Sequence, residues 1–380
     1  MPHSPQVVSA ADVDREAPRW SDSAPALRRR TLLQAGASLL ALGARAAFAQ
    51  HRVPLADMHS HLGMLSRASL ADQMRANGVA LVAWALPSDL PWTHAVSTGI
   101  AQRSVPAAGE PAAFFAARLD RENVTLANAG LKRVLTAADV DACVAGEEHG
   151  VVLAAEGADF LEGRLDGLSA VYDQGLRHLQ LVHYIASPIG DRQTSEPQFN
   201  GLSAVGKLLV EACNERGLLI DLAHCAETAV DQALQISKVP MVWSHSWVRE
   251  VGGRWQDTYG YQQRRLSLAR AKAIADRGGV VGVWGFGLER PGVGRNAWSV
   301  GRNDAMGYAR ELADLVDQIG ADHVGIGTDL AGVGASASIN DYADLRKVVA
   351  HLQELRLPDS AIERVACTNY ARVLKTAMMG

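Results

Sequence analysis

Eight short β-rich runs alternate with amphipathic stretches from residue 53 onward, and this order constrains the fold more than any other feature. Several runs are continuously apolar, which is typical of strands covered on both faces. Strands joined by crossover helices in this order predict an α/β fold, specifically a TIM-type (β/α)8 barrel. An open doubly wound sheet is the alternative, but no GxGxxG motif follows a strand. The runs are Val53–Asp57, Val79–Leu86, Val151–Ala155, Arg177–Val182, Leu218–Ala223, Pro240–Ser244, Gly279–Trp284 and His323–Thr328.

The first 49 residues differ from the rest and predict an export signal. Arg28-Arg29-Arg30 precedes a weakly apolar, Ala-rich stretch that ends in the small-x-small cleavage pattern Ala47-Phe48-Ala49. Paired arginines before such a stretch are typical of twin-arginine export. We therefore expect cleavage of residues 1–49, a single domain over residues 50–380, and a periplasmic or secreted protein. An uncleaved membrane anchor is the alternative, but Arg45 interrupts the stretch, which is too short to span a bilayer well.

Composition excludes several kinds of binding partner and site. The chain has 380 residues, 48% of them hydrophobic, which is enough for one large core. Its net charge is −4 and it has no long basic run, so we expect no nucleic-acid partner. No further segment is long and apolar enough to cross a membrane, so no stable span is expected after cleavage. The four cysteines form no Cys-x-x-Cys pair, which argues against a cysteine zinc site.

Imidazoles and carboxylates gather at the ends of the predicted strands. His59 and His61 follow the first run, and residues two apart on a strand point to the same side. A barrel brings the carboxyl ends of all its strands to one rim. A single histidine at a strand end is more often structural, but the whole set predicts a hydrolytic metal site. The candidate metal ligands are His59, His61, Glu156, His224, His245 and Asp329.

The number and type of these ligands indicate two divalent ions. A mixed imidazole and carboxylate set favours Zn²⁺, with Mn²⁺, Fe²⁺ or Co²⁺ as alternatives. Six candidates are too many for one tetrahedral ion. Glu156 can bridge two ions because a carboxylate has two oxygens. We therefore predict a metal-dependent hydrolase with its active site at the carboxyl ends of the strands.

The ordered motifs resemble the membrane (renal-type) dipeptidase family of the amidohydrolase superfamily. The resemblance covers nearly the whole chain after residue 53, and the segments occur in the family's order. Matching segments include Asp57-Met58-His59, Glu156-Gly157, residues 175–183, Gly201-Leu202-Ser203, residues 220–224, Ser244-His245-Ser246, residues 278–282, residues 323–329, and Asn369 with Arg372.

The resemblance implies a role for each ligand. His59 and the residue two further on bind one ion, His224 and His245 bind the other, and Glu156 bridges them. In this family the second residue after the histidine is usually aspartate (His-x-Asp), whereas this chain has His59-Ser60-His61. That change removes one negative charge from the predicted site. The His-x-His pattern is common in the wider superfamily, so we expect metal binding to survive.

The resemblance also implies three roles in catalysis. Asp329 is the expected acid and base, since a carboxylate beside the nucleophilic water can pass a proton to the leaving amine. His183 is expected to contact the scissile carbonyl, where an N–H stabilises an oxyanion. Arg264 is expected to pair with the terminal carboxylate of the substrate, which suits a guanidinium fork. The polar residues that usually follow this arginine are replaced by Arg265-Leu266-Ser267-Leu268.

These inferences give a leading function and two alternatives. The leading hypothesis is hydrolysis of dipeptides or similar small amides with a free carboxylate by two-metal catalysis. Another amidohydrolase activity, on N-acyl amino acids, cyclic amides or lactones, is the first alternative. A non-catalytic periplasmic barrel that binds a metal or ligand is the second. The expected partner is a small-molecule substrate. The sequence does not decide between a monomer and a homodimer.

Overall fold

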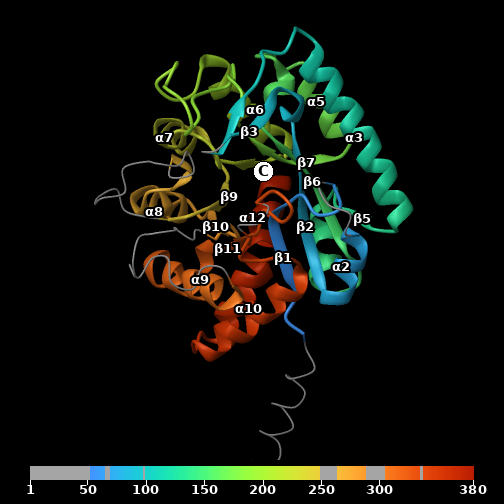
Figure 1. Ribbon diagram of the computed structural model, residues 1–380, viewed down its shortest axis with the longest axis vertical. Coiled ribbons are helices and arrows are strands. Elements are labelled where there is room, and N and C mark those ends of the chain that lie inside the picture. The colour runs from blue at the N-terminus through green and yellow to red at the C-terminus, as the bar shows by residue number, and fades with distance from the viewer. Residues whose placement is uncertain (1–51, 65–68, 97–98, 249–262, 288–303, 334–336) are drawn as a thin grey trace, which may run out of the picture. The chain divides into compact units, whose positions relative to one another are not determined.

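The structure is a computed structural model that describes residues 52–64, 69–96, 99–248, 263–287, 304–333 and 337–380. Within this part of the chain, Val53–Gly380 forms one compact unit. Figure 1 shows its strands in the middle and helices such as α3, α7 and α9 outside them. The predicted export signal at residues 1–49 lies outside the described residues and stays a prediction.

Eight parallel strands form the barrel that the sequence predicts. They pair in the order β1-β2-β6-β7-β8-β9-β10-β11, and the short β5 (Lys132–Arg133) pairs with β6 off this path. The ring returns to its start where Ser60 bridges Leu330 and the Asp329 N–H donates to the His59 carbonyl at 2.8 Å. The strands are β1 Leu55–Ser60, β2 Val79–Pro87, β6 Gly150–Glu156, β7 Leu176–Gln180, β8 Leu219–Asp221, β9 Val242–Ser246, β10 Val280–Trp284 and β11 Val324–Gly327.

Helices follow the strands, as the alternation of β-rich runs and amphipathic stretches predicts, and polar side chains fix where several helices begin. Ser203, Ser267 and Asp304 each accept a hydrogen bond from the backbone N–H three residues later, which satisfies a donor that the first turn leaves free. The helices are α2 Leu70–Asn77, α3 Glu110–Ala129, α4 Ala137–Val144, α5 Gly167–Asp173, α6 Ala204–Arg216, α7 Glu227–Ile236, α8 Leu268–Asp276, α9 Ala305–Ile319, α10 Tyr342–Glu354, α11 Asp359–Glu363 and α12 Asn369–Met378.

The C-terminal segment closes the amino-terminal end of the barrel. The sequence predicts one helix over residues 359–378, whereas the structure divides it into α11, a π-helical turn over Arg364–Thr368, and α12. Tyr370 and Leu374 of α12 belong to a buried apolar cluster that also contains Met58 of β1. The Asn369 amide donates to the Ala321 and Val324 carbonyls at 2.7 and 2.8 Å, which ties α12 to the start of β11.

Two long insertions after strands contain ordered structure. Residues 87–111, which the sequence predicts as an insertion between a strand and a helix, contain the antiparallel strands β3 (Thr93–Val96) and β4 (Gly99–Gln102). In the insertion after β7, the Asp191 carboxylate accepts hydrogen bonds from the Gln198, Phe199 and Gly201 N–H groups. All four cysteines are buried and free. None of the described helices is long and apolar enough to span a membrane.

Candidate active site

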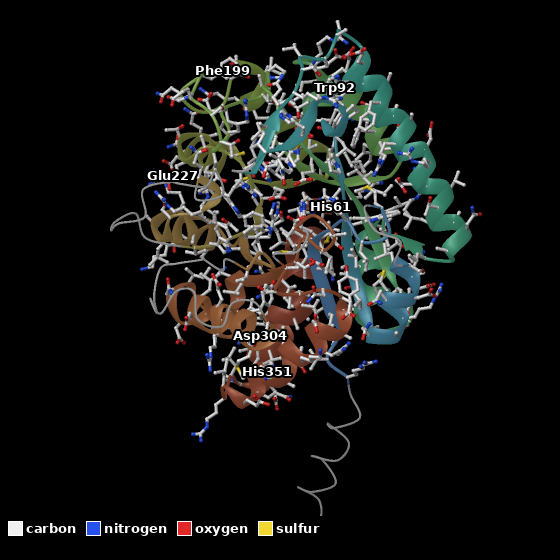
Figure 2. The ribbon with its side chains drawn as sticks, in the orientation of Figure 1. His61, Trp92, Phe199, Glu227, Asp304 and His351 are labelled. Carbon is white, nitrogen blue, oxygen red and sulfur yellow. The ribbon has the colours of Figure 1, made fainter. Side chains whose placement is uncertain are left out.

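The strand ends bring the six predicted ligands together at one rim of the barrel. His59 lies in β1 with His61 just after it, Glu156 ends β6, and His245 lies in β9. His224 and Asp329 follow β8 and β11 by a few residues. All six side chains are buried, between 1% and 7% exposed. Figure 2 shows His61 near the middle of the ribbon, whereas the labelled Glu227 and Phe199 lie closer to its edge.

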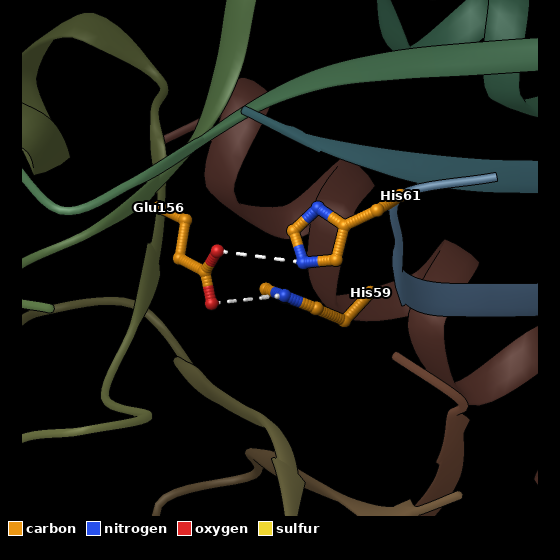
Figure 3. Close-up of side chains that lie close together, drawn as sticks. All are labelled: His59, His61 and Glu156. Atoms are coloured by element: carbon orange, nitrogen blue, oxygen red, sulfur yellow. Dashed lines mark ion pairs between the residues drawn. The ribbon is translucent and has the colours of Figure 1, made fainter. Parts of the chain in front are cut away.

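Glu156 lies at the centre of this group. Its Oε1 is 3.2 Å from His59 Nε2, and its Oε2 is 3.5 Å from His61 Nε2, so each oxygen faces one imidazole (Figure 3). On another side, His183 Nε2 and His224 Nε2 lie 3.2 and 3.6 Å from Oε1. Burial by itself raises the pKa of Glu156, but His183, His59 and His61 outweigh burial and hold that pKa well below its usual range. The carboxylate is therefore ionised and placed between two sets of imidazoles.

The position of His61 is fixed by a backbone contact. Its Nδ1 lies 2.8 Å from the Ala85 carbonyl oxygen, which can only accept a hydrogen bond, so Nδ1 carries a proton. The opposite nitrogen, Nε2, points at Glu156 and lies 3.1 Å from Asp329 Oδ1. Burial lowers the pKa of His61, yet Glu156 and Asp329 outweigh it and raise that pKa. Two carboxylates around one imidazole nitrogen require a cation between them, which is a proton or a metal ion.

A second group consists of Glu156, His224 and His245. One ligand atom from each residue lies within 4.8 Å of the others, and the same holds for His59, His61 and Glu156. Burial, followed by the Arg264 charge, lowers the pKa of His224 well below its usual range. Burial, followed by His59 and Arg264, does the same to the pKa of His245. Both imidazoles are therefore neutral, which is the form that binds a metal ion.

Buried polar atoms without hydrogen bonds and strained backbone show whether these residues suit a metal ion. Both ring nitrogens of His224 are buried without a hydrogen bond to any described residue, and His59 Nε2 also makes none. Such buried orphan atoms cost free energy unless a ligand satisfies them. His224 and Asp329 also have φ angles of 69° and 54°, a left-handed conformation that ordinary side chains rarely adopt. These features fit metal binding by the two groups, which have Glu156 in common.

Asp329 is oriented by a tryptophan. The Trp284 indole N–H donates to Asp329 Oδ2 at 2.9 Å, which leaves Oδ1 facing His61. An indole N–H can only donate, so this oxygen of Asp329 is the acceptor. This contact fixes which oxygen of Asp329 points into the site.

Arg264 is buried and directed at the second group. Arg264 is 0% exposed, which excludes a solvated position in the loop. Nη1 donates to Gln193 Oε1 at 2.7 Å, and Nη2 donates to His245 Nε2 at 2.9 Å. A metal ion and a guanidinium both need the same lone pair of His245. In the structure this lone pair of His245 is occupied by Arg264.

Sequence reasoning missed Asp89, which holds His183. Asp89 Oδ1 lies 2.7 Å from His183 Nδ1, and Asp89 Oδ2 accepts the Tyr184 and Ile185 N–H groups at 2.9 and 3.1 Å. Burial lowers the pKa of His183, but Asp89 and Glu156 outweigh it and raise that pKa to about 10. Asp89 follows β2 by two residues, the same strand-end position that identified the other site residues.

Comparison with known proteins assigns the family. The family model for the membrane dipeptidases, peptidase family M19, matches residues 51–379. The chain belongs to this family. That membership places it among the metal-dependent dipeptidases.

Similar curated proteins include an uncharacterized protein and a dipeptidase. An uncharacterized protein encoded in the pqqA 5′ region of Klebsiella pneumoniae is 28% identical over 256 residues, which cover 64% of this chain and 88% of that protein. Dipeptidase tcpJ of Claviceps purpurea is 25% identical over 230 residues, 59% of this chain and 50% of that protein. The match thus spans about half the length of that fungal dipeptidase.

Solved structures show the same fold. The dipeptidase AC, a metallopeptidase of family M19, superimposes with a TM-score of 0.69 at 21% identity and covers 87% of this chain and 100% of that one. A metallopeptidase from Rhodobacter sphaeroides, liganded with a phosphinate mimic of the dipeptide L-Ala-D-Ala, gives 0.67 at 21% identity over 86% and 99% of the two chains. At this identity the likeness concerns the barrel alone.

Proposed function

We propose that the chain hydrolyses dipeptides with two divalent ions, for which Zn²⁺ is the favoured metal. His59 and His61 would hold one ion, His224 and His245 the other, and Glu156 would bridge them. The observation that carries this proposal is the Glu156 carboxylate, with imidazole nitrogens of both groups 3.2 to 3.6 Å from its oxygens. When bound, two ions lower the pKa of a shared water and supply a nucleophile near neutral pH.

The protein's own residues then move the protons. Asp329, with one oxygen held by Trp284 and the other turned to His61, is placed to accept a proton and pass it to the leaving amine. His183, held from behind by Asp89, directs Nε2 into the site, where an N–H can stabilise the negative charge that develops on the scissile carbonyl oxygen. Both groups sit on contacts that fix their orientation before substrate arrives.

We propose that Arg264 selects substrates with a free terminal carboxylate. Its guanidinium is buried beside His245, with Gln193 holding one of its nitrogens and the Trp284 ring 5.2 Å from its centre. A desolvated guanidinium binds a carboxylate strongly and geometrically. A dipeptide places its carboxylate one residue beyond the scissile bond, and a protein chain does not, which favours small substrates.

The test compares a dipeptide with its C-terminal amide, in the wild type and in Arg264→Met. We expect the wild type to prefer the free carboxylate and the variant to lose that preference, by roughly 2–4 kcal/mol in kcat/KM. Arg270→Met is a matched control, because Arg270 pairs with Asp231 on the outer helices at 2.8 Å. Equal cleavage of both substrates by the wild type would contradict the carboxylate role and favour the broader amidohydrolase activities.

We also propose that the protein is exported by the twin-arginine route and loses residues 1–49. The support is the paired arginines, the Ala-rich stretch and the Ala47-Phe48-Ala49 pattern. Mass spectrometry of the protein recovered from the periplasm tests this, with residue 50 as the expected first residue. A protein that keeps residue 1 would contradict it.

A further inference from the structure

Strand β9 carries an extra residue at the point where it reaches the site. Val281 and Val283 of β10 pair with Trp243 and Ser246 of β9. Between these two pairs β10 has one residue and β9 has two. Such a bulge bends a strand and re-aims its side chains. Glycines on the next two strands make room for it, because a Cβ at Gly282 or Gly327 would collide with the Ser244 carbonyl oxygen. The bulge lets Ser244 and His245, which are consecutive in sequence, both reach the site.

The hydroxyl of Ser244 contacts one imidazole from each candidate metal group. Ser244 Oγ lies 2.8 Å from Nδ1 of His245 and 3.4 Å from Nδ1 of His59, and the side chain is fully buried. His59 belongs to the first group and His245 to the second. The two rings also lie against each other, with centroids 3.9 Å apart. One hydroxyl therefore supports a predicted ligand of each ion.

The direction of these hydrogen bonds follows from their neighbours. Arg264 Nη2, which can only donate, faces His245 Nε2 at 2.9 Å, so Nε2 carries the lone pair and Nδ1 the proton. His245 Nδ1 therefore donates to Ser244 Oγ. The backbone N–H of Ser244 donates to Asp221 Oδ1 at 2.9 Å, which holds this residue beside the two rings. A hydroxyl has one hydrogen and two lone pairs, so it can also accept from His59 Nδ1.

We propose that Ser244 is a positioning residue that orients one histidine of each metal group and so couples the two ion sites. In both histidines the hydroxyl lies against Nδ1 and leaves the opposite nitrogen, Nε2, to bind the ion. This inference rests on the proposed two-ion function. It predicts that loss of a single hydroxyl weakens both sites together, whereas loss of one ligand such as His61 weakens mainly one.

The experiment titrates Zn²⁺ into the full-length, metal-free protein by calorimetry, for the wild type, Ser244→Ala and Ser244→Thr. We expect Ser244→Ala to weaken both binding steps by about 10- to 100-fold, the usual effect of removing a partner of a metal-bound histidine. Ser244→Thr keeps a hydroxyl and should restore much of the affinity. Ser60→Ala is the matched control, because Ser60 is equally buried beside the ligands but accepts from the Leu62 N–H.

A second readout follows the hydrogen bond to Ser244 directly. Spectra of ¹⁵N-histidine-labelled, metal-free protein show the ring N–H groups, and we expect the His245 Nδ1–H to shift its resonance and to exchange faster with water in Ser244→Ala, because its acceptor is lost. Weakening of one ion alone, or of neither, in a folded Ser244→Ala protein would overturn the coupling. If that variant does not fold, Ser244→Cys keeps the volume with a weaker hydrogen bond and must show the same joint loss. A wild type that binds fewer than two ions would instead contradict the proposed function.

Discussion

The two ends of the barrel use histidine in opposite ways. At the amino-terminal end, His149 Nδ1 lies 2.7 Å from the Val79 carbonyl oxygen, and His323 Nδ1 lies 3.0 Å from that of Gly279. Each ring joins the starts of neighbouring strands and stays partly exposed. At the carboxyl end, His59 and His224 are buried with Nε2 atoms that make no hydrogen bond to the described residues.

This difference separates residues kept for stability from residues kept for chemistry. At the amino-terminal end, α12 packs beneath the strands, and its Asn369 amide donates to two backbone carbonyls. The carboxyl end contains features that raise the free energy of the folded protein, namely a buried carboxylate among imidazoles and left-handed backbone at His224 and Asp329. Such features are expected where binding of a ligand offsets this free energy. Substitutions at the two ends should therefore change different measurements.

The largest effect is expected for Glu156→Gln. The amide keeps the shape of the side chain but removes the charge that both candidate metal groups share. We expect loss of most activity and of at least one bound ion, measured by kcat/KM and by metal analysis of the same sample. A Glu156→Gln protein that keeps both ions and full activity would show that the carboxyl end does not bind metal through Glu156.

Asp329→Asn should lose activity but keep metal. Asparagine can still accept the Trp284 N–H, so the side chain stays in place while its ability to carry a proton is lost. We expect a decrease in kcat on the order of 10²-fold or more, the scale of general acid–base catalysis. Parallel loss of ions and activity would show that Asp329 is mainly a ligand.

His61 sharpens the comparison within the carboxyl end. His61→Ala should weaken one of the two ion sites, because its Nε2 faces Glu156 and Asp329 at 3.5 and 3.1 Å. His61→Asp should retain activity with an altered preference among Zn²⁺, Mn²⁺ and Co²⁺, since an anionic oxygen ligand favours harder ions. Metal titrations of both variants test this. Unchanged metal content in the alanine variant would mean that His61 only lines the cavity.

Asn369→Ala should affect the amino-terminal end alone. It leaves the Ala321 and Val324 carbonyls without their side-chain donor, so the free energy of unfolding should fall by about 1–3 kcal/mol. Ion content and kcat/KM per folded molecule should not change. Denaturant unfolding combined with activity assays tests this, and a lost ion in this variant would show that the two ends are not independent.

The sequence predicts most of the barrel and its rim because both depend on simple periodicities. Continuous apolar runs identify buried parallel strands, and the spacing of two places His59 and His61 on one face. The hairpin over residues 93–102 was not predicted, because it lies in a stretch without a strong β pattern. The π-helical turn over Arg364–Thr368 was not predicted either, since it interrupts a continuous helical pattern.

Contacts that depend on irregular backbone, or that join residues far apart in the chain, leave no periodic pattern and were therefore not predicted. Ser244 reaches two imidazoles only because β9 bulges, whereas regular alternation turns Ser244 away from the face of His245. Asp89 reaches His183 across 94 residues of chain, and no local pattern links the two. The burial of Arg264 likewise depends on Gln193, which lies 71 residues away.

The most direct test of the account is the number of metal ions in active, unchelated protein. Inductively coupled plasma analysis of the full-length chain, purified without chelator and with its dipeptidase activity measured in parallel, gives this number. The account predicts two ions per chain, with activity lost on chelation and restored as both sites refill. One ion per fully active chain, or none, would contradict the shared Glu156 site on which the whole comparison rests.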